Sequence, residues 1–246
     1  MDFDGFQKYL NKTIKFFFGV LLFLIIVGVL HSYNIQKNTP PEQRNKTLDE
    51  RLAKAYHIDL NENYPKPWPP EMNSPYPDYV LIDQKGEKFN LSDYKGMIIA
   101  MEMVDMSSPV SQALSGAEKY GVYGATQTYD KFVKPLSEAL KEETKGALTL
   151  PNPNILTIKV LFYRPDGGQA LPADAENWAA HFKLKKEDNV IVAVPEKDMR
   201  GDTTGKIVPG YQLIDQDMVL RVDSAGPVPK HNYEMTLVPM IPKLLK

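Results

Sequence analysis

Two apolar runs of strand length constrain the fold of this 246-residue chain more than any other feature. Residues 97–104 read MIIAMEMV and residues 155–163 read ILTIKVLFY, so apolar side chains occupy both odd and even positions of each run. Such runs are typical of strands that are buried on both faces of a sheet. Sequence with helical patterning separates them, as a right-handed crossover between parallel strands requires. We therefore expect the two runs to form adjacent, parallel central strands.

Shorter strands and helices are expected around these two runs. In chain order the pattern predicts β-β-β-α-α-β-α-β-β-β-α, which indicates a mixed sheet with helices on both faces. The further strands are expected at residues 79–83, 87–91, 190–194, 211–215 and 218–223. The helices are expected at residues 109–120, 126–143 and 174–182, with a short last helix that begins near Pro239.

The N-terminal part carries an apolar segment that is long enough to span a membrane. Every residue from 16 to 30 is apolar or glycine. As a helix, residues 14–33 extend about 30 Å, the thickness of a bilayer core, if Lys15 extends toward the surface. A cleaved signal peptide would also fit, but no small-x-small cleavage site follows the run. We therefore expect an uncleaved transmembrane helix that holds the protein in a lipid bilayer.

Lysine positions set the expected orientation of this helix. Lys8, Lys12 and Lys15 precede or begin it, whereas the first cation beyond it is Lys37. Cytoplasmic flanks are enriched in lysine and arginine, so residues 1–13 are expected on the cytoplasmic side. The rest of the chain is then expected on the periplasmic face of a bacterial inner membrane, or on the equivalent outer face of another energy-transducing membrane.

Residues 34–78 are expected to be a spacer between this helix and a domain at residues 79–246. The stretch from Thr47 to Glu50 has the form of a capping box, which predicts a short helix within the spacer. Six prolines then fall within residues 64–77. This density of proline is typical of a semi-rigid, extended chain.

Aromatic residues are interleaved with these prolines. Tyr64, Trp68 and Tyr76 offer large, rigid side chains of the kind that proteins use at interfaces. We expect these three residues to bind a partner protein. The alternative is that they pack against the protein's own domain.

The absence of cysteine excludes several classes of chemistry. Without a thiol the chain has no disulfide, no dithiol redox couple, no thiolate nucleophile and no cysteine-bound zinc or iron–sulfur cluster. Its 4 histidines are scattered singly, and its net charge is only −2 with no block of like charge. A zinc enzyme and a nucleic-acid-binding protein are therefore not expected, and we expect no cofactor and no metal.

One part of the sequence resembles known families. Residues 79–96 read YVLIDQKGEKFNLSDYKG, an apolar run follows, and residues 106–111 then read MSSPVS. This order resembles the opening of the thioredoxin-like families, which include peroxiredoxins, membrane-anchored thiol oxidoreductases of cytochrome maturation and copper chaperones of cytochrome oxidase assembly. Residues 208–217 (VPGYQLIDQD) resemble the segment with the cis-proline of those families. The resemblance covers residues 76–246 and implies an α/β, thioredoxin-like mixed central sheet with flanking helices, preceded here by one transmembrane helix.

The resemblance also implies where an active site would lie. The two family cysteines correspond to Ser108 and Ser111, with Pro109 between them and Pro209 as the cis-proline, so that the Val208–Pro209 bond is expected to be cis. Ser108 is a good N-cap and Pro109 a good first helical residue. A serine hydroxyl stays protonated and cannot carry two electrons. Hydrolysis is not expected either, because the sequence has no Gly-x-Ser-x-Gly turn to present a nucleophile and no histidine near these positions to act as a base. We therefore expect these positions to be vestigial, with no catalytic residue.

Four methionines offer an alternative chemistry, because thioethers are soft ligands for Cu(I). Alternation places Met97, Met101 and Met103 on one face of a central strand, where methionine usually fills gaps in a core. Met106 alone is expected to reach the following loop. Core packing is the favoured interpretation, and a copper site is the alternative.

These features together predict a non-catalytic, single-pass membrane protein. We expect a thioredoxin-like accessory or assembly subunit of an integral membrane protein complex, which acts through protein–protein contacts. One alternative is a copper-chaperone-like assembly factor with methionine ligands. The other is an enzyme whose catalytic residues the sequence does not reveal.

Overall fold

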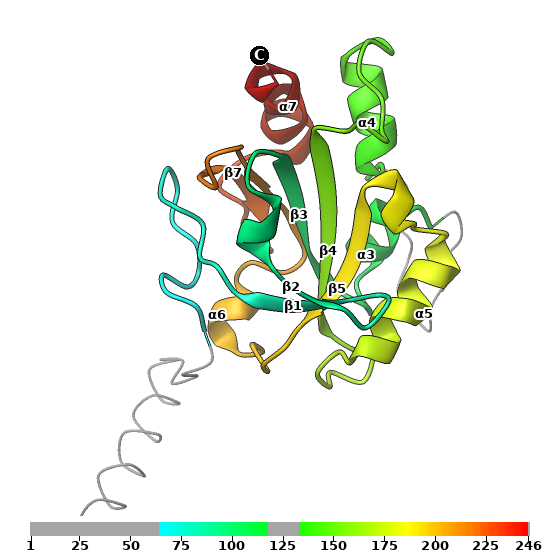
Figure 1. Cartoon of the computed structure of the whole chain (residues 1–246), viewed down its shortest axis with the longest axis vertical. Helices are drawn as coiled ribbons and strands as arrows, with labels where there is room; N and C mark the ends of the chain where they lie inside the picture. The colour runs from blue at the N-terminus through cyan, green and yellow to red at the C-terminus, as the bar shows by residue number, and fades with distance from the viewer. Residues whose placement is uncertain (1–63, 118–132, 246) are drawn as a thin grey trace, which may run out of the picture. The chain divides into compact units, whose positions relative to one another are not determined.

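The computed structural model describes residues 64–117 and 133–245, which form a seven-stranded mixed sheet with packed helices (Figure 1). The strand order across the sheet is β2-β1-β5-β4-β3-β6-β7. The strands are β1 (Val80–Asp83), β2 (Lys88–Asn90), β3 (Ile98–Asp105), β4 (Ile155–Tyr163), β5 (Val190–Pro195), β6 (Gly210–Ile214) and β7 (Leu220–Ala225). The helices are α3 (Pro109–Leu114), α4 (Leu136–Glu143), α5 (Pro172–Phe182), α6 (Asp202–Gly205) and α7 (Val238–Leu244), with short helical turns η1 (Leu91–Tyr94), η3 (Lys186–Asp188) and η4 (Tyr233–Leu237).

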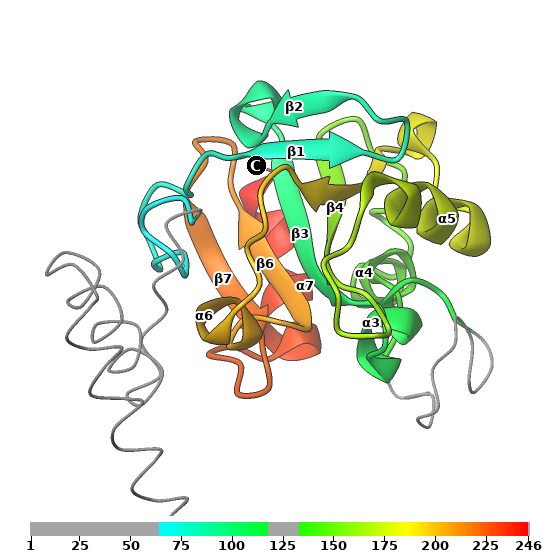
Figure 2. The same cartoon turned by 90° about the horizontal axis from the view of Figure 1, so that it is seen from below.

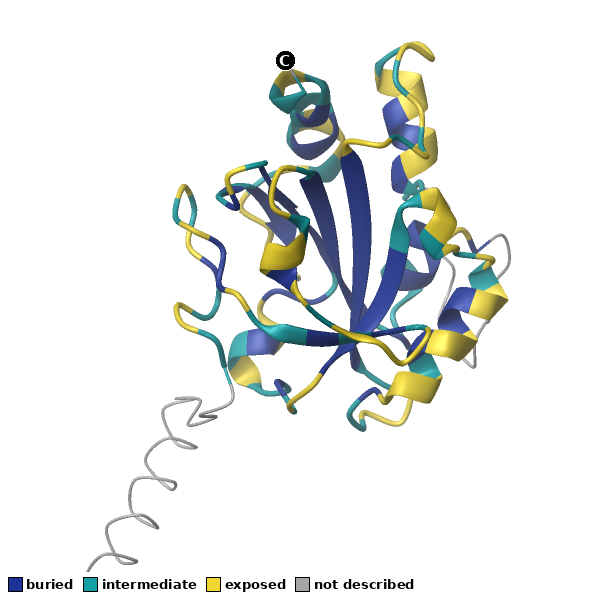
Figure 3. Cartoon of the chain, in the orientation of Figure 1, coloured by how far each residue is buried: buried dark blue, intermediate teal, exposed yellow. Residues whose placement is uncertain are grey.

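The two long apolar runs form the centre of the sheet, as predicted. β3 and β4 are adjacent and parallel, with Ile98 opposite Ile155 in their register. Residues 98–104 and 155–162 are all buried, since both faces of the sheet are covered (Figure 3). β5 is parallel to β4 on its other side, whereas β6 is antiparallel to β3 and β7 is antiparallel to β6.

Helices α3, α4, α5 and α7 lie on one face of the sheet. Alternation along β3 points Ile98, Ala100 and Val104 to this face, where the first two pack with α3, α4 and α7 and the third packs with α5. Figure 2 views the opposite face, with α7 behind β3 and β6. The prediction of helices on both faces is therefore wrong for these four. The connections from β3 to β4 and from β4 to β5 both step across the sheet toward the same edge. Two right-handed crossovers that step in one direction place their helices on the same face.

The Pro-rich segment at residues 64–77, here called the strap, covers part of the opposite face (Figure 1, cyan). Tyr76 is only 5% exposed and packs into the hydrophobic core. Its backbone N–H donates to the carbonyl of Met218 at 2.6 Å, and the N–H of Leu220 donates to the carbonyl of Ser74 at 3.1 Å. The strap therefore covers the edge of the sheet at β7 and is part of the domain.

The position of the strap corrects two predictions. The last part of the predicted spacer is folded domain, because its backbone pairs with β7 and its aromatic rings bury apolar area. The three aromatic residues expected to bind a partner contact their own domain, as the alternative interpretation holds. Besides the buried Tyr76, the hydroxyl of Tyr64 donates to the carbonyl of Arg200 at 3.3 Å, and Nε1 of Trp68 donates to Oγ1 of Thr204 at 3.1 Å.

Two helices are shorter than predicted in the described residues. α3 ends at Leu114, and Gly116 then takes a φ of +96°, which is typical of a chain leaving a helix. α4 begins at Leu136, directly after Pro135, because proline disfavours helical geometry at the residue before it. The prediction of a helix at residues 126–143 is thus confirmed only for its last part, and its first residues lie outside the described ranges.

The elements predicted before the strap also lie outside the described residues. They are the N-terminal segment at residues 1–13, the transmembrane helix at residues 14–33 and the short helix of the spacer. Within residues 64–117 and 133–245, every helix is too short or too polar to cross a membrane.

Candidate functional site

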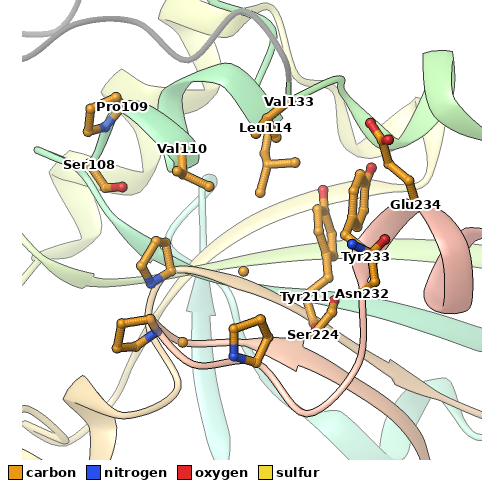
Figure 4. Close-up of a pocket in the computed structure, with 15 residues that line it drawn as sticks. Ser108, Pro109, Val110, Leu114, Val133, Tyr211, Ser224, Asn232, Tyr233 and Glu234 are labelled. Atoms are coloured by element: carbon orange, nitrogen blue, oxygen red, sulfur yellow. The ribbon is translucent and has the colours of Figure 1, made fainter.

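The vestigial positions lie at the C-terminal end of β3, where α3 begins (Figure 4). Oγ of Ser108 caps α3 by accepting the backbone N–H of Ser111 at 3.5 Å, and Pro109 is the first residue of this helix. Ser111 is fully buried, and its Oγ accepts the backbone N–H of Asp105 at 3.2 Å. Both hydroxyls are therefore engaged with backbone, a role that the sequence predicted for Ser108 alone.

Pro209 lies on the loop that faces this helix start. The Val208–Pro209 bond is cis, as the resemblance implied. The carbonyl of Pro209 accepts the backbone N–H of Gly226 at 2.7 Å. This bond joins the loop before β6 to the loop after β7, and the two loops form one side of the site.

Gly226 is required for this junction. Its φ is +89°, and a Cβ there would lie 1.9 Å from the carbonyl oxygen of Lys206. We expect Gly226→Ala to lower the free energy of unfolding by about 2 kcal/mol or more, since backbone strain and a clash with backbone add together. Urea denaturation measures the loss. Gly86→Ala is the matched control, because Gly86 has a φ of +79° but nothing within 4 Å of the added Cβ. Equal losses in the two variants would show that the clash is absent.

The two loops, the start of α3 and η4 enclose a cavity of about 650 Å³, here called the groove (Figure 4). Its lining is mainly apolar and includes Leu114 and four prolines, Pro109, Pro209, Pro227 and Pro229. Cavities of a few hundred Å³ with apolar walls and a few polar groups are the usual sites of ligand binding. The vestigial positions therefore border an open binding surface.

Two stacked tyrosines form another wall of the groove. The rings of Tyr211 and Tyr233 are 5.5 Å apart with an angle of 18° between their planes. The carbonyl of Tyr211 accepts Oγ–H of Ser224 at 2.8 Å, and the hydroxyl of Tyr233 donates to the carbonyl of Lys134 at 3.2 Å. These bonds fix the wall to β7 on one side and to the segment before α4 on the other.

A buried ion pair lies behind Tyr211, and sequence reasoning missed it. The register of the sheet places Glu102 on β3 between Lys159 on β4 and Tyr211 on β6. Nζ of Lys159 donates to Oε2 of Glu102, to the carbonyl of Leu114 at 3.1 Å and to the hydroxyl of Tyr211 at 3.3 Å. Glu102 is fully buried, and Lys159 is 3% exposed. The pair thus supports the tyrosine wall from inside the core.

Burial controls the protonation of this cluster. Burial raises the pKa of Glu102, and the charge and hydrogen bond of Lys159 oppose this shift. Burial also raises the pKa of Tyr211 well above its usual value, and the nearby Glu102 carboxylate adds to the shift. Among the described residues, Oε1 of Glu102 has no hydrogen-bond partner. Tyr211 is therefore a neutral phenol at physiological pH.

Comparison with known proteins gives matches to solved structures alone. No protein-family model and no curated protein matches the sequence. A putative electron transfer protein from Aquifex aeolicus is 12% identical, with a TM-score of 0.45 over 72% of this chain and 99% of that one. A putative protein disulfide isomerase from Bacteroides thetaiotaomicron is 10% identical, with a TM-score of 0.46 over 72% and 92% of the two chains. A SCO1/SenC family lipoprotein from Bacillus anthracis is 13% identical, with a TM-score of 0.43 over 76% and 100%.

The topology, rather than these scores, decides the fold. A parallel strand–helix–strand unit from β3 to β4 is followed by the antiparallel pair β6 and β7 and by a C-terminal helix. Pro209, which precedes β6 and has a cis bond before it, faces the start of the helix after β3. The fold is thioredoxin-like. Ser108 and Ser111, the positions to which the resemblance assigned the two family cysteines, lie in this fold at the start of the helix after β3.

The thioredoxin-like domain offers Ser108 no evident base. Among the described residues that line the groove, none is histidine, lysine or arginine. A serine nucleophile needs such a neighbour to take its proton. The groove can therefore bind a ligand, but its described lining does not provide the constellation of a serine hydrolase.

Two of the three methionines predicted for the central strand are core residues, whereas Met97 directly precedes β3 and is half-buried against the core. Met101 and Met103 are fully buried, and Sδ of Met101 lies 3.2 Å from the hydroxyl oxygen of Tyr76, whose proton is donated to Gln212. Met106 lies in the turn between β3 and α3, as predicted, but its side chain is fully buried and packs in the core with Trp178 of α5. Within the described ranges, no group of three or more histidine, cysteine, aspartate or glutamate residues is placed to hold a metal ion.

Proposed function

We propose that this protein is a non-catalytic, membrane-anchored accessory or assembly subunit of an integral membrane protein complex, and that its thioredoxin-like domain acts through protein–protein contacts. One observation carries the proposal. The groove is open, with a volume of about 650 Å³, although serine occupies both positions where a dithiol would react. A binding surface that lacks its redox groups supports a role in binding rather than in electron transfer.

Membrane attachment is the second part of the proposal. It rests on the apolar segment at residues 14–33 and on the lysines that precede it. With residues 1–13 in the cytoplasm, the domain lies on the outer face of the inner membrane, where it meets the exposed parts of integral membrane proteins. The strap is part of the domain, so the groove rather than the strap aromatics is the proposed contact surface.

Filling the groove should release the partner complex. Val110 is a half-buried residue of α3 that lines the groove, and a tryptophan in its place would occupy part of the cavity. We expect Val110→Trp in the full-length protein to reduce the amount of co-purified partner at least tenfold in mild detergent, measured by quantitative mass spectrometry. The melting temperature should stay within a few degrees of wild type.

The matched control places the same side chain far from the groove. Ala180 is exposed on α5, so Ala180→Trp should retain the partner. Equal recovery of partner with Val110→Trp and with wild type would contradict the proposed contact surface. Peptidase, esterase or peroxidase activity in the purified full-length protein that Val110→Trp abolishes would contradict a non-catalytic role.

A further inference from the structure

The groove contains a single acidic side chain, and this carboxylate limits what the groove can bind. Among the described residues that line it, Glu234 is the only aspartate, glutamate, lysine, arginine or histidine. Glu234 is exposed at the second position of η4, beside the Tyr233 ring (Figure 4). A ligand that covers the groove therefore meets one carboxylate in an otherwise apolar and aromatic wall.

Two lysines near Glu234 are already paired with other carboxylates: Lys230, which lies close to it in sequence, and Lys134, which is close enough in space to interact with the Glu234 charge. Nζ of Lys230 lies 2.9 Å from Oδ2 of Asp223, and Nζ of Lys134 lies 2.6 Å from Oε2 of Glu142. In the part of the chain that the structure describes, Glu234 takes part in none of the ion pairs. A cation on the occupant of the groove can therefore pair with Glu234 without displacing a lysine of the domain.

The surroundings of the groove favour a polypeptide over a small molecule. Val228 is 87% exposed and Met235 is 81% exposed, and they are two of the three exposed large apolar side chains in the described residues. Both adjoin lining residues in the sequence, Val228 between two prolines and Met235 after Glu234. Exposed apolar side chains beside a cavity mark protein contact sites. A small molecule inside the groove would leave them in water, whereas a polypeptide that extends beyond the groove over residues 227–235 would cover them.

We propose that the occupant of the groove is an apolar segment of a partner protein that carries one lysine or arginine, whose cation pairs with Glu234. This inference rests on the proposed function. An apolar segment removes water from the Glu234 carboxylate, and an unpaired carboxylate in such surroundings weakens binding. A cation on the segment offsets that loss, whereas an acidic residue adds repulsion. Glu234 therefore selects among apolar segments by charge.

Peptide selection on the full-length protein tests the pairing. A phage-displayed library of random dodecapeptides is panned on wild type, Glu234→Gln and Glu234→Lys, with Glu176→Gln on α5 as the control for loss of an exposed carboxylate. We expect wild type and Glu176→Gln to enrich apolar peptides with lysine or arginine at least threefold over the library. Glu234→Gln should lose this preference, and Glu234→Lys should select acidic residues instead.

A double-mutant cycle with one selected peptide then isolates the ion pair. Replacing the basic residue of the peptide by norleucine should weaken binding to wild type about tenfold, measured by calorimetry, and should change binding to Glu234→Gln less than twofold. The inference is overturned if the norleucine peptide loses affinity equally for wild type and for Glu234→Gln, or if the selected peptides lack lysine and arginine. It is also overturned if Val110→Trp abolishes the binding of none of the selected peptides.

The outcomes separate this inference from the proposed function. If Val110→Trp releases the partner complex while Glu234→Gln keeps the preference for basic residues, the charge pairing is wrong and the proposed function stands. If Val110→Trp retains the complex, the groove is not the contact surface, and both this inference and that part of the proposed function fail.

Discussion

Replacing Lys159 by methionine is expected to lower the free energy of unfolding by about 3–5 kcal/mol. Glu102 is fully buried between β4 and β6, and the change would remove the cation next to it. Its Oε1 already lacks a hydrogen-bond partner among the described residues, so the carboxylate would be left in the core with little compensation. Breaking a buried ion pair on one side costs more than the pair itself contributes. Urea denaturation at neutral pH measures the loss.

The double variant Glu102→Leu, Lys159→Met is the control. It removes both charges and keeps similar side-chain volumes, so its stability is expected within about 1 kcal/mol of wild type or above it. Two acceptors, the carbonyl of Leu114 and the hydroxyl of Tyr211, lose a donor in both variants and so do not explain a difference between them. A double variant as unstable as the single variant would contradict the account of an uncompensated charge.

The pH dependence of the single variant follows from the same pair. Burial raises the pKa of Glu102, and removing Lys159 takes away the two largest opposing effects, so that the hydrogen bond of Tyr211 alone still opposes the shift. A carboxyl group whose folded pKa lies above its unfolded value costs stability when it is ionised, and the cost disappears as the pH falls through the raised pKa. Lys159→Met should therefore regain stability relative to wild type as the pH falls from neutral through the acidic range. A constant difference between the two proteins across this range would show that Glu102 does not titrate there.

The two central strands were the part of the fold that the sequence predicted best. Apolar residues at consecutive positions predicted β3, β4 and their parallel pairing, because burial of a strand on both faces is visible locally. The ion pair was also within reach. Each run contains one charged residue, and the register that places Ile98 opposite Ile155 also places Glu102 opposite Lys159. Neither run by itself indicates a partner for its charged residue, because the pairing depends on the register between the two strands.

The candidate site was predictable in part, and only through the resemblance. The helix start at Ser108 and Pro109 follows from local capping chemistry, but the groove does not, because its walls come from three separate parts of the chain. Tyr211 and Tyr233 stand in ordinary strand and helix sequence, and only the packing of η4 against β6 stacks them. Nothing in the local pattern of either residue indicates a binding wall.

The strap shows what local pattern cannot provide. Six prolines predict an extended backbone, whereas residues 64–74 bend and turn, and the bonds before Pro67 and Pro69 are cis. The local pattern also leaves open whether such a segment crosses solvent or lies on a protein surface. Its contacts decide between the two, and they are distant in sequence: Trp68 bonds to Thr204 and Tyr76 bonds to Gln212, each 136 positions away. The exposed edge of β7 gives the physical reason, since unpaired backbone groups at a sheet edge favour a covering segment.

Tyr76→Ala is expected to lower the free energy of unfolding by about 3–5 kcal/mol, the usual loss when a large aromatic side chain is removed from a core. Tyr76 is 5% exposed and packs with Met101 on the face of the sheet opposite the long helices. Its removal would leave a cavity beneath the strap and a buried Gln212 without its donor. Thermal and urea denaturation of the full-length protein measure the effect.

Tyr76→Phe separates packing from hydrogen bonding. It keeps the ring but removes the hydroxyl that donates to Oε1 of Gln212 at 2.7 Å, so a loss of about 1–2 kcal/mol is expected. If residues 64–77 were a solvent-exposed spacer, neither variant would change the melting temperature. A large loss for alanine and a smaller one for phenylalanine would establish that the strap is anchored in the core through Tyr76.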